Sequence, residues 1–66
     1  MLQMLRDMIG NTGSVNEVYG GYEITVNNKE KFPWYETCNF LLDSSFEVWI
    51  VKSESNLVIM SKPAVD

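Results

Sequence analysis

The first nine residues carry apolar side chains with the period of a helix. One side of that helix would hold Leu2, Leu5, Met8 and Ile9, which is the spacing of an amphipathic helix. Gly10 follows directly, and glycine readily adopts the left-handed conformation at which helices end. A helix shorter than about 12 residues is marginal in water by itself. We therefore expect this helix to pack against another element.

After the helix, apolar residues recur at every second position. Apolar and polar residues alternate over residues 22–26, which predicts a strand with one solvated face. A shorter β-prone run at residues 15–19 precedes it, and Gly20-Gly21 between the two runs is typical of a two-residue turn. We therefore expect a hairpin over residues 15–27, followed by a polar loop.

Two periods compete over residues 32–42. A helix begun with Pro33 at its first position would align Trp34, Cys38, Leu41 and Leu42 on one side. A strand would instead place on one face Phe32, Trp34, Cys38, Phe40 and Leu42. We favour the strand, because aromatic residues and threonine are enriched in strands and because only a compact turn, residues 43–45, precedes the next segment.

Two further strands are predicted at residues 46–52 and 57–60, and both of their faces are apolar. One face would carry Phe46, Val48, Ile50, Leu57 and Ile59, and the other Trp49, Val51, Val58 and Met60. An antiparallel sheet covered on one side by a helix should be polar on its other side. Either the sheet curls into a small barrel, or a second copy or another protein covers the apolar surface.

These segments predict a single domain over residues 1–66 of the α+β class. A short N-terminal helix would pack on a four- to five-stranded antiparallel meander, with a small barrel as the alternative. A chain of this length buries only about 60% of its unfolded surface. Cys38 is the only cysteine and there is no histidine, so an intramolecular disulfide and a zinc site are excluded. We expect an efficient core or a homo-oligomer, with Cys38 as a small buried hydrophobe.

The charged and polar residues argue against duplex nucleic-acid binding and against catalysis. Nine acidic residues face five basic ones, for a net charge of −4, and the acids are spread singly along the chain. Binding to nucleic-acid duplexes depends on Lys and Arg, so a basic protein partner fits this chain better. Without histidine, no acid–base pair is visible, the serines lie in turns, and the glycines lack the spacing of a phosphate loop. We expect neither an enzyme nor a bound cofactor or metal.

Four aromatic residues in and near the predicted third strand exceed what so small a core readily holds. Phe32 and Trp34 fit a core with Tyr35 half-exposed, or the rings anchor a partner, as Trp and Tyr often do at interfaces. The candidate partner-binding residues are Phe32, Trp34, Tyr35, Trp49, Val51 and Met60.

Two functional hypotheses follow. The first is a small acidic protein-binding module, an inhibitor or regulatory factor of the kind that phages and mobile elements carry. The second is a single-stranded nucleic-acid binder that stacks bases on its aromatic rings, which the negative charge disfavours. No stretch approaches the roughly 20 apolar residues that span a bilayer, and Gln3 and Arg6 interrupt the N-terminal apolar run. We expect the cytoplasm, either of the cell or of an infected host.

Overall fold

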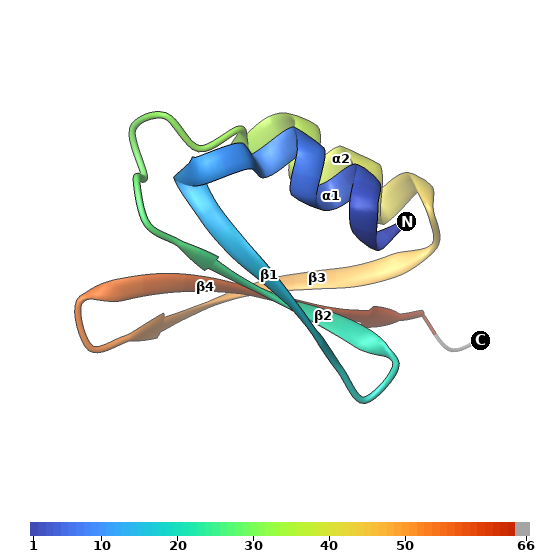
Figure 1. Ribbon diagram of the computed structural model, residues 1–66. Helices are drawn as coiled ribbons and strands as arrows, with labels where there is room; N and C mark the ends of the chain where they lie inside the picture. Colours follow the sequence, from blue (N-terminus) through green and yellow to red (C-terminus); the bar gives the residue numbers. More distant parts are fainter. Residues whose placement is uncertain (65–66) are drawn as a thin grey trace.

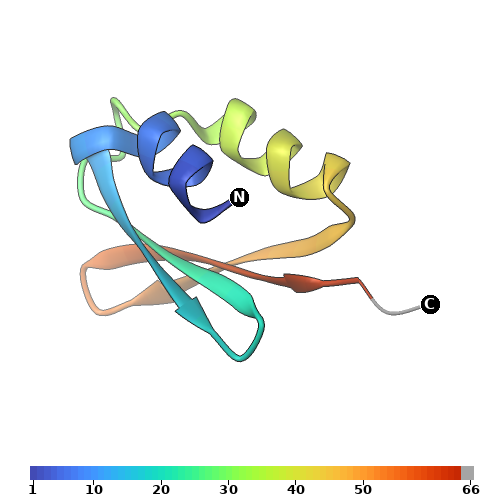
Figure 2. The ribbon, with the colours of Figure 1, turned by 45° about the vertical axis from the view of Figure 1, so that its right-hand side comes forward.

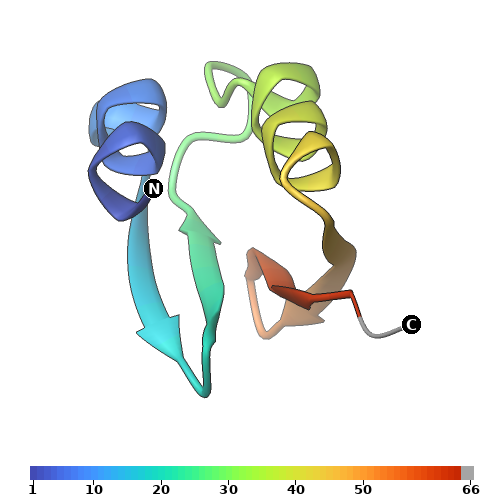
Figure 3. The same ribbon diagram turned by 90° about the vertical axis from the view of Figure 1, so that its right-hand side faces the viewer.

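Two helices lie on one face of a four-stranded antiparallel sheet in the computed structural model, which describes residues 1–64 (Figure 1). Both helices are on the same side of the sheet in every view (Figures 2 and 3). The predicted α+β class, with a short N-terminal helix on an antiparallel sheet, is confirmed. The elements are α1 (Leu2–Ile9), the 3₁₀ turn η1 (Gly10–Thr12), β1 (Gly13–Val18), β2 (Gly21–Val26), α2 (Trp34–Asp43), β3 (Phe46–Ser53) and β4 (Asn56–Pro63).

The strands follow the order β1-β2-β4-β3, so the sheet is not a simple meander. β4 lies between β2 and β3 and is antiparallel to both, and β2 and β3 therefore run in the same direction. Strands that run in the same direction need a crossover connection, which α2 supplies. The sheet is open, with β1 and β3 as its edges, and it does not close into the alternative barrel.

The N-terminal helix and the first hairpin lie where the periods predict them. Leu5 and Ile9 are buried, and Gly10 ends α1 at a φ of 59°. The turn between β1 and β2 is centred on Tyr19 and Gly20, with φ values of 46° and 83°, one residue earlier than predicted. Two positive φ angles are typical of a type I′ turn, the form that matches the twist of a hairpin. Gly21 instead begins β2, where a Cβ atom would overlap the backbone carbonyl of Ser61.

The strand predicted over residues 32–42 is wrong, because Trp34–Asp43 is the helix α2. Pro33 directly precedes the helix, and its carbonyl oxygen accepts the Thr37 N–H at 3.0 Å. Its missing N–H therefore costs no helical hydrogen bond. Thr37 and Leu41, one turn apart, are the buried residues of α2. Packing of this narrow stripe on the sheet outweighs the weak strand preference of the aromatic residues.

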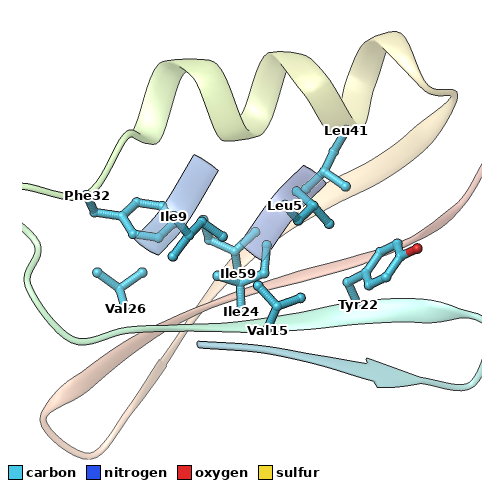
Figure 4. Packing of buried hydrophobic residues seen from close by; sticks show 9 residues of the cluster. All are labelled: Leu5, Ile9, Val15, Tyr22, Ile24, Val26, Phe32, Leu41 and Ile59. Carbon is cyan, nitrogen blue, oxygen red and sulfur yellow. The ribbon is translucent and has the colours of Figure 1, made fainter. Parts of the chain in front are cut away.

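The core lies between the helices and the inner face of the sheet, which is the face that α1 and α2 cover (Figure 4). Both helices and three of the strands contribute to it, and β3 adds only partly buried residues. No helix within residues 1–64 is long and apolar enough to cross a membrane. The buried hydrophobic residues are Leu5, Ile9, Val15, Tyr22, Ile24, Val26, Phe32, Leu41 and Ile59.

Candidate protein-docking surface

An apolar patch occupies the outer face of the sheet, opposite the helices. β3 and β4 pair Trp49 with Met60 and Val51 with Val58, so two neighbouring cross-strand pairs form the patch. Trp49 is 42% exposed and Val51 is 41% exposed, while Val58 and Met60 are half-buried. Both helices lie on the other side of the sheet (Figure 3), so neither covers these side chains. We call Trp49, Val51, Val58 and Met60 the outer patch.

Polar residues flank the outer patch. On β2, Thr25 pairs with Val58 and Glu23 with Met60, and these residues line an open hollow of about 360 Å³ beside the patch. At the other side, the Lys62 ammonium lies 3.9 Å from a Glu47 carboxylate oxygen and 5.8 Å from the centre of the Trp49 ring. An apolar centre bordered by polar residues is the usual anatomy of a protein interface.

Strand β3 is an open edge of the sheet and is apolar on both faces. Its three central residues Trp49, Ile50 and Val51 are consecutive and all exposed. Trp49 and Val51 point to the outer face, and Ile50 points to the inner face with its partner Ile59. An edge strand also presents a row of N–H and C=O groups with no partner in its own sheet. β3 therefore offers exposed apolar side chains and free backbone hydrogen-bonding groups together.

Ile50 lies on the edge strand β3, which continues into the projecting β3–β4 hairpin. Its turn lies beyond the start of α2 (Figure 1), so no helix covers the inner face there. A hollow of about 490 Å³ occupies this region and is lined by the hairpin residues Lys52, Glu54 and Leu57 together with Lys29 from the preceding loop. Ile59 lies further under the helices and is fully buried.

The predicted aromatic cluster does not form one exposed surface. Phe32 is only 4% exposed and belongs to the core, so we remove it from the candidate partner-binding residues. Trp34 is half-buried, packs edge-on against Phe32 at 4.9 Å between ring centres, and donates its indole N–H to the Lys29 carbonyl at 2.8 Å. Tyr35 is exposed on α2, in the helical layer. No continuous stacking platform joins the three rings.

Three of the six candidates, Trp49, Val51 and Met60, do lie together on the outer face. The structure adds Val58 to this outer-face set, and it adds Ile50 as an exposed apolar residue of the inner face. Val58 follows from the two-residue period of β4, which places it on the same face as Met60. The exposure of Ile50 has no signal in the local sequence, since it depends on where the helices end.

Metal ligands and the single thiol were the remaining candidates for site chemistry. Within residues 1–64, no group of three or more His, Cys, Asp or Glu side chains is placed to bind a metal ion. Cys38, on α2, is partly buried, and this burial raises the pKa of its thiol. A raised pKa lowers the thiolate fraction at neutral pH, and the thiolate is the reactive form. The site with the clearest chemical character is therefore the apolar surface of β3 and β4.

Known proteins give no further guide to this surface. Comparisons of the chain with protein-family models, with curated proteins and with solved structures found no significant match.

Proposed function

We propose that this chain is a protein-binding module that docks on a partner protein through the outer patch and acts as an inhibitor or regulatory factor. The observation that supports the proposal most is the exposure of Trp49 and Val51 side by side with Val58 and Met60 on an uncovered sheet face. Contiguous exposed apolar surface on a small protein is typical of an interaction site.

Trp49 is the expected anchor of the interface. Tryptophan is the residue type most enriched among interface positions that dominate binding energy, and truncating such a residue to alanine costs about 2 kcal/mol or more. Because every 1.4 kcal/mol is roughly tenfold in affinity, loss of this ring should weaken binding by about 30-fold. Val51 and Met60 flank the ring and would exclude water around it.

The expected partner is apolar at its centre and basic around it. The chain carries a net charge of −4, and the carboxylates of Glu23 and Glu47 border the outer patch against the single ammonium of Lys62. Complementary charge at the border of an interface raises the association rate more than it lowers the dissociation rate. We therefore expect binding that is faster at low salt, while the affinity contributed by the apolar centre persists at high salt.

The test compares patch variants with a matched surface variant. Trp49→Ser and Met60→Ser change the outer patch, whereas Leu42→Ser changes an exposed apolar residue of the helical layer. The immobilised chain is used to capture proteins from a host extract, and binding of each captured protein is then measured by calorimetry with all variants. The proposal expects one protein whose binding survives Leu42→Ser and falls by about 30-fold or more with Trp49→Ser.

Two results would contradict the proposal. One is a captured protein that binds the Trp49 and Met60 variants as tightly as the unchanged chain. The other comes from titrating a labelled single-stranded oligonucleotide at low and high salt. Binding at low salt that weakens steeply as salt rises is typical of phosphate contacts, and it would support the nucleic-acid hypothesis instead.

A further inference from the structure

We propose that the hollow beside the outer patch receives the side chain of one arginine of the partner protein, with Glu23 as the carboxylate that binds its guanidinium group. This inference rests on the function proposed above, because the hollow and the outer patch share Val51, Val58 and Met60. It adds the chemistry of the partner at one position. It can fail while docking through Trp49 still holds.

The hollow has an apolar middle and polar surroundings. Val58 and Met60 lie on β4, which has β2 on one side and β3 on the other. The polar residues that line the hollow are Glu23, Thr25, Ser53 and Asn56. The volume of about 360 Å³ is near the lower end of the range for ligand pockets. The hollow therefore fits one side chain better than a whole cofactor.

Glu23 is the only charged residue among those that line the hollow. It lies on the interior strand β2, with Asn16 of β1 and Met60 of β4 as its cross-strand neighbours, and its side chain is half-buried. Glutamate is depleted in strands and is rarely buried without a partner. Within residues 1–64, the Glu23 carboxylate has neither an ion-pair partner nor a side-chain hydrogen bond. It is therefore open to a cation from another molecule.

The ammonium of Lys62 pairs with other groups instead of Glu23. Lys62 follows Met60 by two positions on β4 and so lies on the same face of the sheet. Its ammonium lies 3.9 Å from a Glu47 carboxylate oxygen and 5.8 Å from the centre of the Trp49 ring, and both of these residues belong to β3. The carboxylate on the β2 side is therefore left for a partner to compensate.

Arginine matches an apolar middle with one carboxylate better than lysine does. Its aliphatic stem packs on apolar surface while its charge stays at the polar border. The planar guanidinium is less strongly hydrated than an ammonium, and it donates a pair of parallel hydrogen bonds to a carboxylate. Its other N–H groups would meet the oxygen atoms of Thr25, Ser53 and Asn56, which can accept hydrogen bonds. Arginine is also enriched at protein interfaces, whereas lysine is depleted.

A capped arginine tests the site without the partner protein. N-acetyl-arginine amide, whose guanidinium is its only charge, is titrated at constant ionic strength into the isotopically labelled chain, and the amide chemical shifts are followed by NMR. We expect saturating shifts that gather at Glu23, Thr25 and Val58, with a dissociation constant of the order of 1–10 mM. N-acetyl-lysine amide should bind roughly fivefold more weakly. Shifts that do not saturate, shifts that gather on the helical layer, or equal binding of the two compounds would overturn the proposal.

Charge variants assign the binding to Glu23. Glu23→Gln keeps the shape of the side chain and removes its charge, so binding of the arginine compound should weaken by about fivefold or more while the NMR spectrum of the fold persists. Glu17→Gln is the matched control, because it removes the same charge from an exposed position of β1 outside the hollow. It should leave the binding unchanged. Equal binding by the Glu23→Gln chain would refute the assignment.

A captured partner protein separates this inference from the function on which it rests. Trp49→Ser weakens binding of the partner if docking uses the outer patch, whereas Glu23→Gln weakens it if an arginine enters the hollow. Loss of binding with Trp49→Ser but not with Glu23→Gln would keep the docking function and overturn the arginine contact. Loss with Glu23→Gln but not with Trp49→Ser would contradict docking through the outer patch and keep the arginine site.

Discussion

Three isoleucines form a row across the inner face of the sheet, and they test where the core ends. Ile24 on β2 pairs with Ile59 on β4, and Ile59 pairs with Ile50 on β3. Ile24 and Ile59 are 0% exposed, whereas Ile50 is 54% exposed. The three residues share their side-chain type, their face and a strand backbone. They differ in their place in the sheet, because Ile24 and Ile59 lie on the central strands β2 and β4, whereas Ile50 lies on the edge strand β3.

Ile→Val at each position removes one methylene group and keeps the β-branched shape that strands favour. In a closed core this change costs about 0.5–1.5 kcal/mol of unfolding free energy. A chain of 66 residues has a total stability of roughly 3–10 kcal/mol, so the variants should remain folded. Ile→Ala, at about 2–5 kcal/mol, would leave little stability to measure. At Ile50 the methylene is largely in water, and the expected cost is below about 0.5 kcal/mol.

Thermal unfolding followed by tryptophan fluorescence measures these differences. Ile24→Val and Ile59→Val should lower the melting temperature by about 4–8 °C for each kcal/mol lost, and Ile50→Val should leave it nearly unchanged. The protein is kept dilute so that self-association does not contribute. An equal loss of stability at Ile50 and Ile59 in dilute solution would refute the reasoning, because it would mean that the end of β3 is covered within one chain.

Three further changes test particular contacts. Gly21→Ala should destabilise the chain more than Gly20→Ala in thermal melts, because its Cβ would overlap the rigid Ser61 carbonyl, whereas Gly20 has open space and only its φ of 83° to disfavour alanine. Ser61→Ala should raise the unfolding free energy by about 1 kcal/mol, because the buried Ser61 hydroxyl has no hydrogen-bond partner within residues 1–64; an unchanged urea midpoint would contradict this. The Cys38 thiol, whose pKa burial raises, should react with iodoacetamide more slowly in the native chain than in urea. Since folding favours the protonated thiol, its contribution to stability is present below the pKa of the unfolded chain and declines as the pH rises above it.

The N-terminal helix and the first hairpin could be predicted because each places apolar residues at regular intervals on the one face that packs against the core. The segment that forms α2 could not, since only Thr37 and Leu41 are fully buried there and a stripe of two residues fixes no period. Its aromatic residues prefer strands only weakly, and a helix with one solvated side accommodates them. The tertiary structure decides its conformation, because β2 and β3 run in the same direction and a crossover must connect them. The local sequence does not encode that requirement.

One wrong segment also produced the wrong strand order. If residues 33–42 were a strand, consecutive strands would pair in sequence, as neighbouring strands do in about two-thirds of cases. As a helix, the same segment carries the chain across the sheet and leaves room for β4 beside β2. The candidate site was predicted better, because the apolar alternation of β3 and β4 marks both faces directly. Aromatic character alone was a poor guide, since Phe32 is buried while Trp49 is exposed.

The geometry of short helices on longer strands explains why the exposed surface is at β3. α2 has ten residues and β3 has eight, so the helix spans about 15 Å and the strand about 26 Å. α2 ends close to where β3 starts, because only Ser44 and Ser45 join them. The last three strand residues, 51–53, therefore extend past the helix, and Ile50, about 13 Å from the start of β3, lies at the limit of the length that α2 covers. The projecting residues are Val51, Lys52 and Ser53, and the exposed apolar residues Trp49 and Ile50 directly precede them. On the outer face of the same strand, Trp49 and Val51 stay exposed for a different reason, since both helices lie on the other side of the sheet. The surface open to a partner protein is therefore set by which face the helices cover.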